Sequence, residues 1–188
     1  VGTIKGTRSV PRLPLPRRPW ERIDGQGTVI GRFPGYAILL SKYPYYAHVL
    51  AQLEPLHDPT VGTMGVSADG RRFYLHLDLD WVARNQEFLL GLMLHEVHHI
   101  VLGHVTHPRF FGAAHPDLMS LAMEMSANEF VAEPLPGRPI RFELFAELEI
   151  RAKQSTLERY DRLVAGRLAG VLPTQLDVET VDHHHRSG

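Results

Sequence analysis

The stretch LLGLMLHEVHHIVLGHV, from Leu89 to Val105, constrains the fold more strongly than any other part of the chain. Apolar residues occupy almost every side of a helix built from this stretch, and such a pattern is typical of a buried helix. We expect the helix to begin at Gln86, with Asn85 as its N-cap, and to end before Pro108. The rest of the domain must therefore pack around it.

Inside this helix the chain contains the pattern HExxH, formed by His95, Glu96 and His99. The two histidines lie about 40° apart on one helix face, so both imidazoles can bind the same metal ion. Glu96 lies about 100° from His95, beside such an ion, where its carboxylate can take a proton from water. Imidazole pairs suit zinc, so we predict one Zn²⁺ ion with Glu96 as the catalytic base. The alternative is a buried helix whose histidines form ordinary hydrogen bonds.

The same angular reasoning separates the other histidines of this stretch from the predicted ligands. His98 lies about 60° from His95 and is predicted to flank the metal face. His104 lies about 180° from His95, so it is predicted to be a packed histidine at the helix end with a hydrogen-bond partner elsewhere. Gly103 continues the metal face and is expected to leave room beside the ion.

A catalytic zinc ion needs at least one more protein ligand, and a second helix can supply it. This helix is predicted to open at Pro116 and carries Glu124, with Glu129 and Glu133 beyond it. Apolar neighbours surround Glu124, so its carboxylate would be costly to bury unless it were paired or metal-bound. We predict Glu124 as the third ligand, with Glu129 in reserve. Asn128 shares the face of Glu124 and is predicted to orient a ligand histidine.

A β-hairpin is predicted from Val61 to Leu79, with its turn at Asp69-Gly70. The second strand alternates apolar and polar residues, which indicates a half-buried strand. Because Arg71–Leu79 directly precedes the HExxH helix, we expect it to be the edge strand that pairs with an extended substrate. Three further side chains are candidates for stabilising an oxyanion: Tyr74, His76 and His115.

The remaining elements complete an α+β fold, in which a small antiparallel or mixed sheet packs on the HExxH helix with further helices around it. A short helix is expected at Tyr43–Leu53, and a long amphipathic helix at Phe142–Leu168. Residues 1–20 form a Pro- and Arg-rich extended arm, residues 21–170 a single domain and residues 171–188 a tail.

Composition excludes several classes of function. The chain has 188 residues with a net charge of −1, so nothing indicates a nucleic-acid partner. It has no cysteine, which excludes disulfides, a thiol nucleophile and cysteine-based metal sites. No apolar run reaches the roughly 18 residues that indicate a membrane span. We therefore expect a cytoplasmic protein that acts on a peptide or protein and has neither a nucleic-acid nor a membrane partner; oligomeric state is not predicted.

The order of the motifs resembles a bacterial metallopeptidase-like domain that is often joined to a VWA-like domain. The segments YPYYAHVLAQL, TMGVSADGRRFYLHLD, MLHEVHHIVLGH and LMSLAMEMSAN follow one another as in that family, over about residues 43–130. The resemblance implies a zincin-like fold in which His95, His99 and Glu124 bind zinc, Glu96 is the base and Asn128 is the family's asparagine. This chain departs from the family at Glu124, where the usual ligand is Asp.

A second resemblance involves the segment from Glu124 to Pro136. Its pattern ExxANxFVAxxLP, in which Pro134 is an added proline, is similar to that of ImmA/IrrE-type metallopeptidases. Those proteins cleave regulatory repressors, and the resemblance implies the same three metal ligands.

The resulting hypothesis is a zinc-dependent metallopeptidase. The alternative is a non-catalytic, metal-stabilised protein-interaction module, or pseudo-peptidase. Two lesser alternatives are another kind of zinc hydrolase, and a protease whose Pro-rich arm occupies its own cleft.

Overall fold

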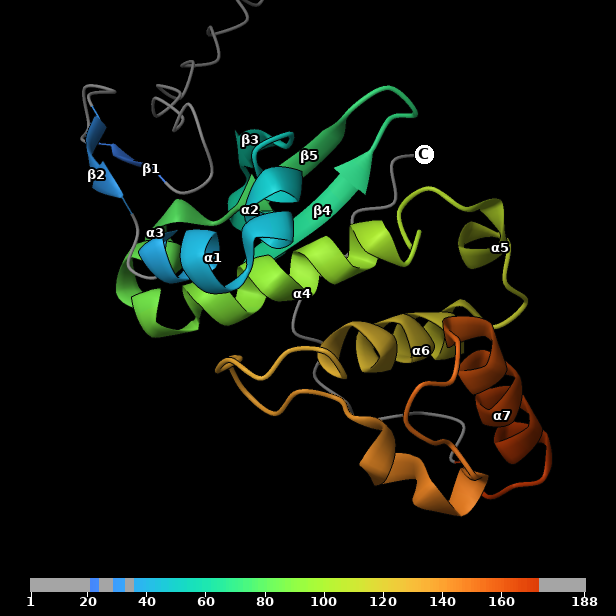
Figure 1. Ribbon diagram of the computed structural model, residues 1–188. Helices are drawn as coiled ribbons and strands as arrows, with labels where there is room; N and C mark the ends of the chain where they lie inside the picture. Colours follow the sequence, from blue (N-terminus) through green and yellow to red (C-terminus); the bar gives the residue numbers. More distant parts are fainter. Residues whose placement is uncertain (1–20, 24–28, 33–35, 173–188) are drawn as a thin grey trace, which may run out of the picture.

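The computed structural model describes residues 21–23, 29–32 and 36–172 (Figure 1). The predicted arm lies outside these residues, as does the predicted tail beyond residue 172. The strands are β1 (Glu21–Ile23), β2 (Val29–Arg32), β3 (Glu54–His57), β4 (Met64–Ala68) and β5 (Phe73–Leu77). The α-helices are α1 (Tyr36–Lys42), α2 (Pro44–Leu50), α3 (Leu79–Arg84), α4 (Leu89–Val101), α5 (Pro108–Phe111), α6 (Pro116–Asn128) and α7 (Thr156–Leu168), and the 3₁₀ helices are η1 (Pro59–Val61), η2 (Gln86–Phe88) and η3 (Phe142–Leu148).

A three-stranded mixed sheet contains the predicted hairpin. Strands β4 and β5 pair antiparallel around the Asp69-Gly70 turn, where the Asp69 carboxylate accepts hydrogen bonds from the backbone N–H groups of Arg71 and Arg72. Gly70 has a φ of 84°, which favours glycine there. The predicted hairpin and the α+β class are therefore confirmed.

The position of β5 within the sheet differs from the prediction. The strand order is β3-β5-β4, with β3 parallel to β5, so β5 is the central strand. The prediction that Arg71–Leu79 offers a free edge to a substrate is therefore wrong. Local sequence could not show this, because the parallel partner EPLH lies about twenty residues earlier and carries no alternating pattern.

Two separate hydrophobic clusters fill the described part of the chain. The first joins α1, α2, the three-stranded sheet, α3 and α4, together with Val131 and Leu135. The second joins α6, η3 and α7, with Ile140 and Ile150. Helix α4 lies between the sheet and α6 (Figure 1), so the α4–α6 contact is where the two clusters meet. Any site built from both helices must therefore lie at this boundary.

Helix α4 is shorter at both ends than the sequence predicts. Asn85 donates from Nδ2 to the carbonyl of Trp81, so its side chain bonds α3 rather than capping α4. At the other end the helix stops at Val101, because Gly103 adopts a left-handed φ of 75°. The N–H of Gly103 donates to the Ile100 carbonyl, which with the next hydrogen bond forms a Schellman cap. The predicted continuation to Pro108 is wrong.

The long helix predicted at Phe142–Leu168 is also wrong. The chain forms η3, turns at Glu149 with a φ of 55°, and starts α7 only at Thr156. Ser155 and Glu158 form a capping box at that start. The helix predicted near Tyr43–Leu53 is confirmed as α2, and the helix start predicted at Pro116 is confirmed for α6, which ends at Asn128. Within the described residues, no helix is long and apolar enough to span a membrane.

Candidate metal centre

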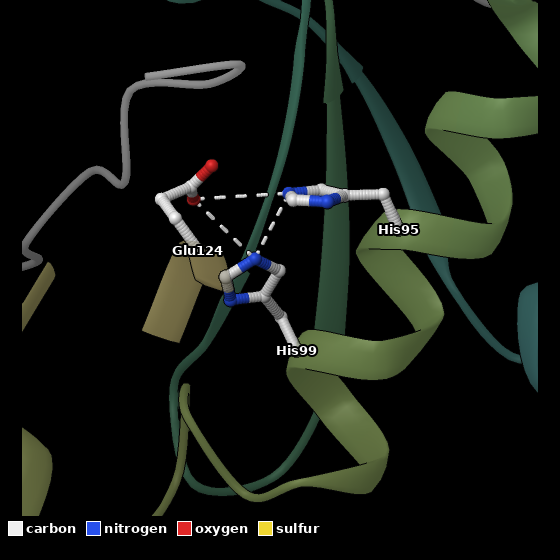
Figure 2. A group of neighbouring side chains, drawn as sticks. All are labelled: His95, His99 and Glu124. Atoms are coloured by element: carbon white, nitrogen blue, oxygen red, sulfur yellow. Dashed lines mark hydrogen bonds and ion pairs between the residues drawn. The ribbon is translucent and has the colours of Figure 1, made fainter. Parts of the chain in front are cut away.

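His95, His99 and Glu124 converge at the boundary between the two clusters (Figure 2). Helix α4 supplies the two histidines and α6 supplies the glutamate. One ligand atom of each residue lies within 4.8 Å of the other two, and all three side chains are fully buried. The three residues predicted as metal ligands are thus brought together in a group that could bind a metal ion.

The spacing of the three atoms fits a small divalent cation. Nε2 of His95 lies 3.0 Å from Nε2 of His99, and Oε1 of Glu124 lies 3.7 and 3.5 Å from these two nitrogens. A point equidistant from the three atoms lies about 2 Å from each, which matches the lengths of Zn–N and Zn–O bonds. A donor set of two imidazoles and one carboxylate is also one that zinc accepts.

Asn128 fixes the proton on His95, as the sequence predicts. Its Nδ2 donates to the carbonyl of Ile140 at 3.0 Å, so its Oδ1 faces Nδ1 of His95 at 2.9 Å. Because an amide oxygen only accepts, His95 must carry its proton on Nδ1. Nε2 then keeps the lone pair that a metal ligand needs.

His104 contacts the second ligand, His99, and this was not predicted. Its Nδ1 lies 3.0 Å from Nδ1 of His99, and its Nε2 lies 2.9 Å from Oγ1 of Thr156. The prediction that His104 is packed is confirmed, since it is only 2% exposed. Its predicted direction, opposite His95, is wrong because the helix ends before it. Gly103 accordingly serves as the helix cap and is not a gap beside the ion.

Glu96, the predicted base, lies on α4 next to His95 and is fully buried. Burial of a carboxylate is costly in free energy unless a hydrogen-bond partner, a counter-charge or a metal ion compensates it. The role of Glu96 as a proton acceptor beside the ion stays a prediction.

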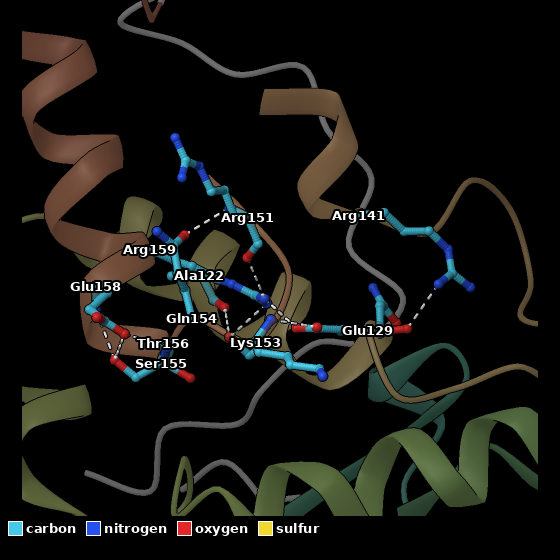
Figure 3. Close-up of polar contacts among 12 residues, drawn as sticks. Ala122, Glu129, Arg141, Arg151, Lys153, Gln154, Ser155, Thr156, Glu158 and Arg159 are labelled. Carbon is cyan, nitrogen blue, oxygen red and sulfur yellow. Dashed lines mark hydrogen bonds and ion pairs between the residues drawn. The ribbon is translucent and has the colours of Figure 1, made fainter. Parts of the chain in front are cut away.

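Glu129 and Glu133, the acids that compete with Glu124 in the sequence, face other groups. Glu129 pairs with the fully buried Arg159 and accepts from the backbone N–H of Lys153 at 2.7 Å (Figure 3). Glu133 accepts from Lys42 at 2.9 Å and from the Tyr43 hydroxyl at 2.7 Å. The reserve role of Glu129 is therefore not supported.

His98 flanks the site, as predicted. Its Nε2 lies 3.0 Å from the hydroxyl of Tyr46, and its ring stacks on Phe130 with centroids 5.3 Å apart. Burial lowers the pKa of His98 to about 4, so this imidazole is neutral near pH 7.

The three candidates for oxyanion stabilisation lie in different places. Tyr74 donates to Asp69 at the hairpin turn, and the backbone N–H of His115 donates to the Tyr160 hydroxyl at the start of α6. The ring of His76 lies between Ser67, 2.8 Å from Nε2, and Asp58, 3.2 Å from Nδ1. Their role near a substrate stays a prediction.

His104 and Thr156 are the residues that sequence reasoning missed. Gly103 was a usable signal, because glycine after an apolar helix often marks its end. The partner Thr156 had no such signal, since it lies 52 residues away on another element.

Comparison of the chain with known protein families, with curated proteins and with solved structures finds no match.

Proposed function

We propose that this chain is a zinc-dependent metallopeptidase with a zincin-like fold. The observation that carries the proposal is the convergence of His95, His99 and Glu124 within 4.8 Å, with Glu96 directly after the first ligand on α4. A purely structural metal site has no need for Glu96 in this position. The resemblance of the motif order to metallopeptidase-like domains points the same way, and a cytoplasmic location stays a prediction.

Three side chains would hold the ion: His95 and His99 through Nε2, and Glu124 through Oε1. A zinc ion bound there supplies Lewis acidity, which polarises a peptide carbonyl and makes water more acidic. Asn128 keeps the proton of His95 on Nδ1, away from the ion.

Glu96 is proposed to move the proton during hydrolysis. Its carboxylate takes a proton from the attacking water as the water oxygen bonds to the carbonyl carbon. The same carboxyl group then gives this proton to the leaving amine nitrogen as the carbon–nitrogen bond breaks. The products are a carboxylic acid and an amine, and Glu96 returns to its starting state.

Burial sets a condition on this activity. The three ligands and Glu96 are each 0% exposed, so solvent does not reach their side chains in this arrangement. A peptide carbonyl must reach the ion during turnover, so the groups that cover these side chains have to move. We expect slow turnover that is limited by this movement.

The test uses purified full-length protein loaded with zinc and assayed on fluorescently labelled casein. Glu96→Gln should bind zinc in the same ratio as the wild type and lose cleavage by about 10²- to 10⁴-fold. Glu124→Ala should lose both zinc and cleavage. Wild-type turnover by Glu96→Gln would refute the role of Glu96 as base.

The burial of the site favours a second candidate function, a non-catalytic interaction module. In such a module, zinc bound between α4 and α6 would stabilise the fold by linking the two hydrophobic clusters. In that case zinc would raise the melting temperature of the wild type and of Glu96→Gln alike. Neither protein would cleave casein or peptides, with or without zinc.

A further inference from the structure

We propose that His104 is a positioning residue of the metal centre, which connects the ligand His99 to Thr156 at the start of α7. The inference rests on the proposed function in one respect, because it takes zinc as the ion that His99 binds. It does not require that the protein cleave peptides.

The path of the backbone brings His104 back to the helix it has just left. After the left-handed Gly103, the N–H of His104 donates to the carbonyl of His99 at 2.8 Å. This hydrogen bond reverses the chain over the last turn of α4, and Nδ1 of His104 thereby lies 3.0 Å from Nδ1 of His99. The contact depends on the cap and would be lost in a helix that continued to Val105.

Metal binding fixes the direction of the hydrogen bonds. His99 needs a lone pair on Nε2 to bind an ion, so its proton must lie on Nδ1, from which it donates to Nδ1 of His104. His104 then carries its own proton on Nε2 and donates it to Oγ1 of Thr156 at 2.9 Å. Each ring then donates from one nitrogen and accepts or binds through the other.

Asn128 and His104 thus act on the two ligand histidines in corresponding ways. Asn128, from α6, accepts from His95, and His104 accepts from His99. Partners of this kind orient the ring of a metal ligand and increase its basicity. His104 is 2% exposed and Thr156 6%, so water cannot easily replace either partner.

The hydrogen bond from His104 to Thr156 also links the metal centre to the contacts that hold the start of α7. Thr156 is the first residue of that helix, and Arg159, less than one turn later, pairs with Glu129 directly after α6 (Figure 3). Helix α7 therefore holds Thr156 in place for His104. Because coupling between two binding events is reciprocal, zinc should in turn hold the start of α7 more firmly.

The test compares four variants of the full-length chain, with zinc affinity measured by competition with a chromophoric chelator. His104→Phe keeps a ring that can pack edge-on against Phe110 but offers no acceptor, and should lower zinc affinity about 10- to 100-fold. His104→Asn retains an acceptor near the position of Nδ1 and should recover part of this loss. Thr156→Val, which keeps the shape of the side chain, should lose about 2- to 10-fold.

Ser155→Ala is the matched control. It removes the N-cap of α7 next to Thr156 without removing a contact of His104, so it should lower stability and change zinc affinity less than Thr156→Val does. If His104 had only a structural role, His104→Phe, His104→Asn and Thr156→Val would instead lower stability, and the zinc affinity of these folded variants would match the wild type.

Two readouts are independent of activity and of affinity. In the zinc-loaded wild type, ¹⁵N NMR of the imidazoles should find His104 protonated on Nε2 and His99 on Nδ1. Zinc should also slow amide exchange in the first turn of α7 in the wild type, and not in His104→Phe.

The proposal is overturned if folded His104→Phe binds zinc like the wild type, or if Nδ1 of His104 is protonated in the zinc form. If His104→Phe fails to fold, wild-type zinc affinity in both His104→Asn and Thr156→Val overturns the proposal instead. Absence of peptidase activity, with zinc affinity still dependent on His104, would refute the proposed function and retain this inference.

Discussion

Oδ1 of Asn128 lies 2.9 Å from Nδ1 of His95, and this contact joins the first hydrophobic cluster to the second at the metal centre. His95 belongs to α4, which packs with the sheet, and Asn128 is the last residue of α6. The amide is held in this orientation by its second hydrogen bond, to the carbonyl of Ile140. Asn128 therefore determines which nitrogen of His95 faces the ion.

The first prediction concerns this amide. Asn128→Ala should lower zinc affinity by about 10- to 100-fold, because the ring of His95 loses the acceptor that sets its orientation and tautomer. Asn128→Asp retains an oxygen for His95 but no donor for Ile140, and should keep more of the zinc affinity. Competition with a chelator measures the zinc affinity of both variants. Equal zinc affinity of Asn128→Ala and the wild type would contradict the prediction.

The second prediction separates two glutamates that the sequence could not fully distinguish. Glu124→Gln should lose more zinc affinity than Asn128→Ala, since it changes a ligand directly. Glu129→Gln should keep zinc binding but lower the free energy of unfolding by about 3–5 kcal/mol, because it leaves the charge of buried Arg159 uncompensated. Metal analysis and urea unfolding of both variants show which glutamate is the ligand. Loss of zinc from Glu129→Gln, with zinc retained by Glu124→Gln, would make Glu129 the ligand instead.

The ligand set was predictable from sequence because each member has a local signal. HExxH on an apolar stretch fixes His95 and His99, and the apolar flanks of Glu124 make a carboxylate there exceptional. Asn128 follows from its spacing of four residues along α6. These predictions hold even where the predicted ends of a helix are wrong, because each depends on residues within only one or two helical turns.

Features that depend on distant partners were not predictable in the same way. The central place of β5 requires β3, and the pairing of Glu129 requires Arg159, 30 residues later. The break before α7 did have a local signal, the capping box of Ser155 and Glu158, but the amphipathic pattern across it suggested one continuous helix. Periodicity alone cannot show where a helix is interrupted when both halves are amphipathic.

The third prediction concerns His76, which the sequence suggested as an oxyanion group. Leu75 and Leu77 are buried in the core, so the intervening His76 projects from the opposite face of β5, toward Ser67 and Asp58. His76→Phe should therefore lower the free energy of unfolding by about 1–2 kcal/mol, through the loss of these hydrogen bonds. Zinc affinity should match the wild type, and a large loss of casein cleavage with normal zinc binding would support the predicted oxyanion role.

The fourth prediction tests the close packing of α4 against the segment that follows α6. A Cβ atom added at Gly91 would lie 2.0 Å from the backbone oxygen of Pro134, and neither element can yield by a change of rotamer. Gly91→Ala should lower the free energy of unfolding by about 1–3 kcal/mol, despite the higher helix propensity of alanine. Because α4 carries both ligand histidines, zinc affinity should fall as well.

Gly112→Ala is the control for this change, since its Cβ would lie 3.6 Å from the backbone oxygen of Pro108, an ordinary contact. It should change the free energy of unfolding by less than about 0.5 kcal/mol. Urea unfolding of the zinc-loaded proteins compares the two variants. If Gly91→Ala is as stable as Gly112→Ala, then α4 and the segment at Pro134 are not in close contact. The prediction of tight packing beside the metal centre would then be wrong.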